Sequence, residues 1–161
     1  MKITAIRGIM LRCTCSPISD ALSTSTARQA LLVKIETDAG LYGIGEAFTY
    51  GAPLKIMKYL VEEQLGPMLI GQDPAEIEKH WNTMYWRTIA HGRRSMTMGA
   101  ISGIDIALWD LLGKAAHMPV CKLLGQHLDR VPSYASGGFY APGKDLHKLE
   151  DELEHYKAQG Y

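Results

Sequence analysis

Residues 98–125 constrain the fold more than any other part of the chain, and they read MGAISGIDIALWDLLGKAAHMPVCKLLG. Apolar side chains recur here at intervals of three and four, which predicts a helix that begins near Ser95 and buries one face. The expected members of this face are Met98, Ile101, Ile104, Asp105, Leu108, Leu111, Leu112 and Ala115. Gly99, Gly103 and Ala107 form a second stripe without bulk. Glycine within a helix costs about 1 kcal/mol relative to alanine, so this stripe predicts a neighbouring element too close for larger side chains.

The first fifty residues favour β-structure. Residues 3–11 alternate like a strand, and residues 30–37 and 41–49 flank an Asp38-Ala39-Gly40 turn. This pattern predicts a hairpin and an antiparallel meander. Residues 15–28 are dense in Ser, Thr and Pro, and by composition we expect a loop there.

Helical patterns follow the sheet. A helix is expected over residues 53–65, and a second one starts at Asp73-Pro74, with Asp73 as its N-cap. Its expected inward face is Ile77, Trp81, Met84, Tyr85 and Thr88. A short helix should run from Pro119 to Gly125.

The end of the chain reads as one βα step. A composition shift over residues 126–132 indicates a domain boundary, followed by a predicted strand over residues 131–139 and a helix over residues 144–158. A single βα unit cannot close a barrel. We therefore expect this end of the chain to depend on further strands for its order.

The block at residues 98–125 resembles the helical end of the N-terminal capping domain of the enolase superfamily, mandelate racemase/muconate-lactonizing subgroup. Residues 2–12, 31–48 (LLVKIETDAGLYGIGEAF) and 131–140 (VPSYASGGFY) resemble its first strand, its hairpin and the first strand of its barrel. The resemblance implies an α+β capping domain over residues 1–125, with an antiparallel three-stranded meander followed by a helical bundle. Residues 126–161 would then be the linker and first βα unit of a (β/α)7β TIM-like barrel that is incomplete in this chain.

The resemblance also implies a chemistry. Such enzymes bind a divalent metal, usually Mg²⁺, and remove the α-proton of a carboxylate substrate through a metal-stabilised enediolate. The metal ligands and the Lys-x-Lys base motif of the family belong beyond Tyr161, so we assign no catalytic residue and no metal ligand to this chain. The favoured activity is an acid-sugar dehydratase, with a racemase or cycloisomerase as the nearest alternative. A non-catalytic module, or one half of a split enzyme, is the other class left open.

Two loops carry the expected substrate contacts. In the family, the loop after the first strand and the loop after the hairpin fold over the barrel mouth and exclude water. They correspond to residues 17–26 and 48–53, and the first is rich in hydroxyl groups. That favours a polyhydroxy acid as substrate, although Ser/Thr-rich loops are often merely solvated. The expected pocket and lid residues are Ile18, Ser23, Thr24, Phe48, Tyr50, Ser136 and Gly137.

Other candidate groups have simpler interpretations. Asp105 is expected to be a structural acid bonded to backbone or to an arginine, for example in the Arg93-Arg94 pair, because a carboxylate on a buried face needs a partner. Asp110 and Lys114, four apart, should form a surface ion pair. The histidines are scattered and the glycines match no phosphate-binding motif. Cys13, Cys15 and Cys121 are expected to be free thiols.

The amino-acid composition limits the classes of partner that we expect. Lys plus Arg and Asp plus Glu balance at 17 each, so nothing in the net charge favours nucleic acid or an anionic membrane. We expect no apolar run to approach the roughly 18 residues of a membrane span, and the start of the chain alternates like a strand rather than a signal peptide. We therefore expect a cytoplasmic location, and the resemblance implies an enzyme that acts on a small carboxylate and forms a homo-oligomer.

Overall fold

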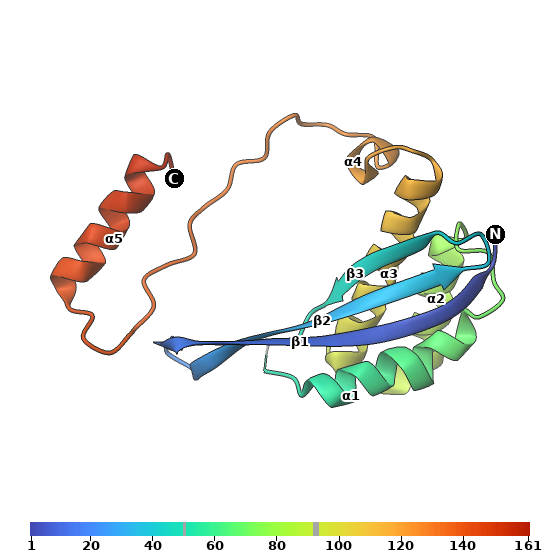
Figure 1. The fold of residues 1–161 in the computed structure, drawn as a ribbon, viewed down its shortest axis with the longest axis horizontal. Helices are drawn as coiled ribbons and strands as arrows, with labels where there is room; N and C mark the ends of the chain where they lie inside the picture. Colours follow the sequence, from blue (N-terminus) through green and yellow to red (C-terminus); the bar gives the residue numbers. More distant parts are fainter. Residues whose placement is uncertain (50, 92–93) are drawn as a thin grey trace. The chain divides into compact units, whose positions relative to one another are not determined.

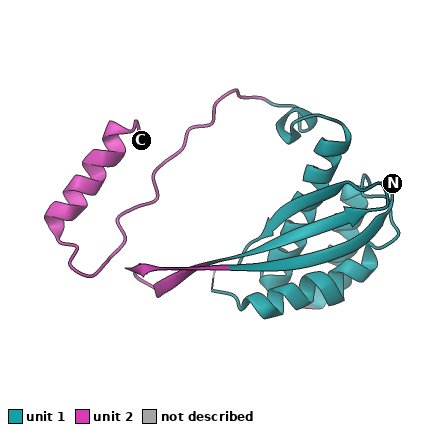
Figure 2. Cartoon of the chain, viewed as in Figure 1, with its two compact units in different colours: residues 1–11, 29–126 teal, residues 12–28, 127–161 magenta. Residues whose placement is uncertain are grey.

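A computed structural model describes residues 1–49, 51–91 and 94–161 of the chain. The chain divides into two compact units, residues 1–11 with 29–126 and residues 12–28 with 127–161 (Figure 2). The second unit thus combines the tip of the first hairpin with the C-terminal segment. The expected division into residues 1–125 and 126–161 stays a prediction.

The sheet is the predicted antiparallel meander. It contains β1 (Ile3–Ser19), β2 (Thr24–Thr37) and β3 (Tyr42–Ala47) in the order β1-β2-β3 (Figure 1). In the β2/β3 pair, Val33 lies opposite Gly45 and Ile35 opposite Gly43. The turn between them contains Gly40 at φ +75, a left-handed conformation that glycine adopts at little cost. Along β2, Leu31, Val33 and Ile35 are fully buried, which is the period-two pattern of a strand with one core face.

The loop predicted over residues 15–28 is wrong. β1 continues to Ser19 and β2 begins at Thr24, so the turn comprises only residues 20–23. Composition was misleading because pairing between neighbouring strands satisfies the backbone groups, and threonine fits well in an extended strand.

Three consecutive helical segments follow the sheet. They are α1 (Leu54–Tyr59), η1 (Leu60–Leu65), wound as a π-helix, and the 3₁₀ turn η2 (Gly66–Met68). The helix predicted over residues 53–65 is therefore present, with a widened second half. Leu54, Met57, Val61 and Leu65 supply its buried face.

The helix α2 (Ile77–Thr88) begins later than predicted. Asp73 and Pro74 belong to a turn in which the Asp73 carboxylate accepts a hydrogen bond from Ala75 N at 3.0 Å, so Asp73 is not the N-cap. An aspartate side chain accepts the same kind of hydrogen bond from a nearby backbone N–H in a turn and at a helix N-terminus. The local sequence therefore does not distinguish the two structures. The buried face of α2 includes Ile77, Met84 and Thr88 as predicted, and also His80, while Trp81 and Tyr85 are half-buried. Beyond α2 lies the 3₁₀ turn η3 (Ile89–His91).

The helix α3 (Met96–Ala115) has Ser95 as its N-cap residue, as predicted. Its buried residues include Ile101, Ile104, Leu108 and Leu111, whereas Ala115, expected on the buried face, is exposed because it lies in the last turn. The small-residue stripe packs directly on β3. A Cβ atom on Gly103 would lie 2.9 Å from the backbone of Ala47, and one on Gly45 would lie 2.7 Å from Ala107 N and closer still to Gly103 O.

The helix α3 is apolar enough to be compared with a membrane-spanning helix. By length and mean hydropathy (1.2) α3 would suffice to cross a membrane, contrary to the expectation that no segment approaches such a span. Just over half (56%) of its apolar window is buried, largely against β3 and the neighbouring helices. Core burial accounts for the same apolar pattern.

The C-terminal segment departs from prediction at its first element. After α4 (Val120–Leu123) and Gly125 at φ +77, residues 131–139 form no strand. Strand geometry needs a paired neighbour, and no strand of the described residues pairs with this stretch. The helix α5 (Leu146–Ala158) is present as predicted, capped by the side chain of Asp145, which accepts a hydrogen bond from Lys148 N at 3.0 Å.

Candidate functional site

The hairpin tip between β1 and β2 is a closed polar turn. The Asp20 carboxylate accepts hydrogen bonds from the backbone of Leu22 and Ser23, both at 2.8 Å, and Asp20 N donates to Ser23 O at 3.0 Å. Ser19 Oγ and Thr24 Oγ1 lie 2.7 Å apart across the base of the turn. An aspartate that bonds to amides two and three residues ahead fixes the turn locally. Local hydrogen bonds therefore fix the backbone of the tip.

A second strip of chain lies against this tip within the same compact unit. Ser19 and Tyr140 exchange two backbone hydrogen bonds, each of 2.8 Å, in an isolated antiparallel bridge. Tyr140 follows the segment that contains Ser136 and Gly137. The bridge brings two regions that were predicted separately into contact at one point.

The same strip is held from its other side by α5. Glu152 accepts hydrogen bonds from Gly138 N at 3.1 Å and from the Tyr156 hydroxyl at 2.9 Å, and it forms an ion pair with Lys144. The hydrogen bond from Lys144, with those from Gly138 and Tyr156, lowers the pKa of Glu152 to about 2. The carboxylate in turn raises the pKa of the Tyr156 hydroxyl, mainly through their hydrogen bond. We call Lys144, Glu152 and Tyr156 the carboxylate clamp.

The second predicted loop belongs to the other compact unit. Gly99 of α3 packs so closely on Phe48 that an added Cβ would lie 2.6 Å from Phe48 O. Phe48 itself is 71% exposed. Tyr50, the other residue predicted from this loop, lies outside the described residues.

The other predicted pocket residues belong either to the hairpin tip or to the strip that leads to Tyr140. Ile18, Ser23 and Thr24 lie at or beside the hairpin tip, and Ile18 is half-buried while the other two are exposed. Ser136 and Gly137 are exposed in the strip that leads to Tyr140. Sequence reasoning missed the residues that hold these parts together, namely Asp20, Tyr140 and the carboxylate clamp. A weak signal was present, because Glu152 and Tyr156 are four apart on a helix and therefore share a face.

Two carboxylates of α3 behave differently from one another. Asp110 forms the predicted ion pair with Lys114 at 2.6 Å. Asp105 has no hydrogen-bond or ionic partner among the described residues, so the expected bond to backbone or arginine is not found there, and Arg93 lies outside the described part. Burial raises the pKa of Asp105.

Histidines and cysteines do not assemble a metal centre in the described part of the chain. His80 is buried, with Nε2 2.7 Å from Asp73 O, and so has a structural role. Cys13, Cys15 and Cys121 are free thiols, as predicted. Across residues 1–49, 51–91 and 94–161, no group of three or more His, Cys, Asp or Glu side chains could hold a metal ion. These residues therefore do not fit a Mg²⁺ site.

Comparison with known proteins decides the family. Residues 4–125 match the mandelate racemase/muconate lactonizing enzyme N-terminal domain. The chain belongs to this family. It is a capping domain of the enolase superfamily, and the three-stranded meander followed by helices is the fold expected for it.

Relatives of this capping domain are acid-sugar dehydratases. Arabinonate dehydratase from Saccharolobus solfataricus is 40% identical over 133 residues, which cover 83% of this chain and 35% of the relative. D-mannonate dehydratase from Novosphingobium aromaticivorans is 38% identical, covering 100% of this chain and 36% of the relative. The capping-domain chain thus spans about a third of the length of these relatives.

A solved structure supports the same family. The crystal structure of L-talarate dehydratase from Polaromonas sp. JS666, complexed with Mg and L-glucarate, matches with a TM-score of 0.80 at 30% identity. The match covers 98% of this capping-domain chain and 43% of that protein. Metal binding is therefore a property of a homologue of this chain.

Proposed function

We propose that this chain is the N-terminal part of a Mg²⁺-dependent acid-sugar dehydratase, and that it supplies the cap over the reacting centre. The observation that carries the proposal is the 38% identity to a D-mannonate dehydratase across the whole chain. We place the ligands of the metal and the base outside residues 1–161, as the resemblance to the family implies, and the described residues contain no cluster that fits a metal.

The proposed reaction is a β-elimination. A general base takes the proton as the C–H bond next to the substrate carboxylate breaks, the electron pair forms a C=C bond, and the neighbouring hydroxyl group leaves as water after it receives a proton from a general acid. The enol product then tautomerises to an α-keto acid. A closed cap favours this reaction because exclusion of bulk water strengthens electrostatic contacts to the developing negative charge.

The contribution of this chain is the hairpin tip. Ser23 and Thr24 are exposed there, and the Asp20 turn holds the backbone around them. Hydroxyl groups on a fixed turn suit a substrate that carries several hydroxyl groups, because each unmatched hydroxyl in a closed site costs a hydrogen bond. The polar tip therefore favours sugar acids over aryl or lactone substrates. The cytoplasmic location and the homo-oligomer stay predictions.

Activity assays on the full-length protein that contains this chain test the proposal. We expect turnover of at least one of D-arabinonate, D-mannonate, D-galactonate and L-talarate to an α-keto acid, detected as its semicarbazone. Treatment with EDTA should abolish turnover, and added Mg²⁺ should restore it. Turnover that persists without metal would contradict the mechanism.

Mandelate serves as the discriminating substrate. Racemisation of mandelate, followed by polarimetry, without dehydration of any sugar acid would replace the dehydratase with a racemase. Absence of both activities would support a non-catalytic role.

A further inference from the structure

The carboxylate clamp and the hairpin tip together fix three consecutive backbone positions. Glu152 receives the N–H of Gly138, and Lys144 Nζ, which pairs with Glu152, also donates to Phe139 O at 2.8 Å. The next residue, Tyr140, makes both hydrogen bonds of the bridge to Ser19. Positions 138, 139 and 140 are therefore held in turn by α5, by Lys144 and by the hairpin tip.

Two glycines lie where the strip meets the clamp. A Cβ on Gly137 would lie 2.5 Å from the Tyr156 ring and 2.7 Å from Glu152 Oε1, so these side chains would have to shift to admit it. Gly138 has φ +77, in the left-handed region that disfavours other residues. The backbone of the strip and the side chains of α5 are thus built to approach each other.

The clamp is more than a solvated ion pair. The side chains of Lys144 and Glu152 are 18% and 22% exposed, against 91% and 71% for the His147 and Glu150 pair on the same helix. Exposed pairs contribute little to stability, whereas a shielded carboxylate that receives three donors restricts each group that it binds. Removal of the Glu152 charge should release Lys144 and Gly138 together.

From this sequence of contacts we infer that Glu152 is a positioning residue for the hairpin tip, acting through Gly138, Phe139 and Tyr140 on Ser19. Its effect on substrate selection rests on the proposed function, because the tip carries Ser23 and Thr24. Its effect on the tip itself does not. Glu152 touches neither substrate nor reacting atoms in this role.

Hydrogen exchange measured by mass spectrometry tests the positioning role without any activity assay. Glu152→Gln in the full-length protein should speed exchange of the Ser19 and Tyr140 amides about tenfold, since each donates one bond of the bridge. Glu154→Gln is the matched control, because Glu154 lies exposed on the same helix outside the clamp. Unchanged exchange in α5 and in α3 would show that both compact units remain folded in the two variants.

Two exchange patterns would overturn the inference. One is faster exchange at residues 134–140 with no change at residues 17–24, which would confine Glu152 to its own strip. The other is no change in either region. Tyr156→Phe provides a milder test if Glu152→Gln does not fold, because it removes a single donor to Glu152; exchange at Ser19 should then rise by a smaller factor.

Steady-state kinetics distinguish the positioning role of Glu152 from the proposed function. With a sugar acid that the wild type dehydrates, Glu152→Gln should raise KM about tenfold and change kcat less than about threefold, because a loosened tip weakens substrate contacts more than the chemistry. Equal effects of Glu152→Gln and Glu154→Gln on KM would contradict the inference. Faster exchange at the tip in a protein that dehydrates no sugar acid would sustain the positioning role and reject only the proposed function.

Discussion

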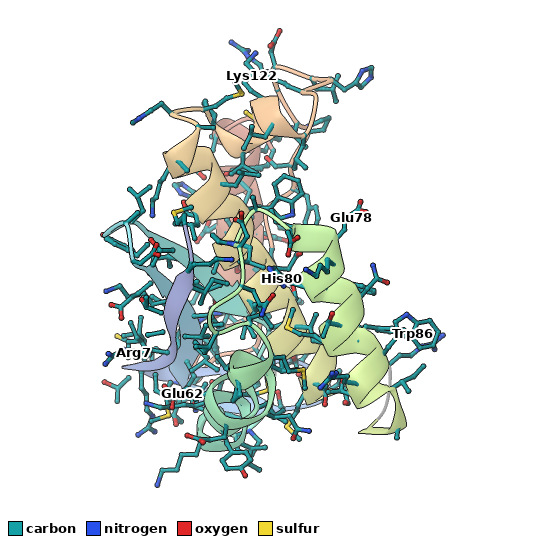
Figure 3. All side chains as sticks on the ribbon, turned by 90° about the vertical axis from the view of Figure 1, so that its right-hand side faces the viewer. Arg7, Glu62, Glu78, His80, Trp86 and Lys122 are labelled. Atoms are coloured by element: carbon teal, nitrogen blue, oxygen red, sulfur yellow. The ribbon has the colours of Figure 1, made fainter. Side chains whose placement is uncertain are left out.

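The carboxylate of Asp110 on α3 accepts a hydrogen bond of 2.7 Å from the backbone N–H of Ile44 on β3. β3 is an edge strand, and Glu62 of η1 makes the equivalent bond, at 2.8 Å, to Gly8 N on β1 at the opposite edge. Figure 3 shows Glu62 on its helix and Arg7, the residue before Gly8, on β1. In the same view Trp86 points away from α2. Helix carboxylates thus satisfy edge amides that would otherwise be open to strand pairing.

Replacement of Asp110 should destabilise the first unit. Asp110→Ala removes both the bond to Ile44 N and the ion pair with Lys114, and we expect a loss of about 1–2 kcal/mol in the free energy of unfolding. Asp110→Asn keeps an acceptor for Ile44 N and should lose less. Urea unfolding measures both, and equal losses would show that the edge bond contributes nothing.

A second prediction follows from the close approach of β3 and α3. Gly45→Ala would place a Cβ 2.7 Å from Ala107 N, where backbone cannot give way, so we expect a loss of about 3 kcal/mol in the free energy of unfolding. The neighbouring Glu46 is exposed, and Glu46→Ala should change stability by less than about 0.5 kcal/mol. Thermal unfolding of the two variants, compared side by side, checks the contact.

The carboxylate clamp should titrate far below an ordinary glutamate. Its hydrogen bonds hold the pKa of Glu152 at about 2 against a usual 4.5. A depressed pKa of an acid means that the stabilisation is complete above pH 4.5 and is lost as pH falls through about 2. The Gly138 amide shift in NMR should follow this low midpoint and should not titrate in Glu152→Gln; a midpoint near 4.5 would contradict the clamp.

Asp105 should show the opposite dependence. Because burial raises its pKa, the folded state binds a proton more tightly than the unfolded state, and stability is lost as pH rises from about 3.8 through the raised pKa. Asp105→Asn removes this titration, so the variant should be more stable than the wild type at pH 7 and the difference should shrink in acid. Denaturation of both proteins at several pH values measures this difference in the free energy of unfolding. A difference that does not change with pH would show that burial does not raise the pKa of Asp105.

The hydroxyl groups of the hairpin tip should affect substrate preference. Ser23→Ala with Thr24→Val in the full-length enzyme keeps the Asp20 turn bonds to backbone and removes both exposed hydroxyl groups. We expect the ratio of kcat/KM between two sugar acids to change about fivefold, the size of one lost hydrogen bond. Ser16→Ala on β1 is the control, and an unchanged ratio across the panel would remove the tip from substrate selection.

Local signals located several elements well. The start of α3 at Ser95, the β2/β3 hairpin with Gly40 in its turn, and α5 were all predicted, because each depends on periodicity and on residues close in sequence. The Asp110 and Lys114 pair also follows from helical spacing alone.

Predictions failed where distant contacts override composition. Residues 15–28 read as a loop, yet strand pairing extends β1 and β2 through most of them. Residues 131–139 read as a strand, yet no described strand pairs with them to complete their hydrogen bonds. The same argument explains why the candidate site was only half predicted, since Ser23 and Ser136 carry a compositional signal and the bridge between Ser19 and Tyr140 carries none.

By itself, the sequence determined the family, the order of the three sheet strands and the helices that follow them, and the glycine stripe that demands a close neighbour, because these depend on periodicity and local steric limits. Tertiary structure alone decided what that neighbour is, which carboxylates satisfy the sheet edges, and how Glu152 reaches the strip that holds the hairpin tip. The physical reason is that a hydrogen bond depends on the position of its partner in space, and partners far apart in sequence leave no periodic mark.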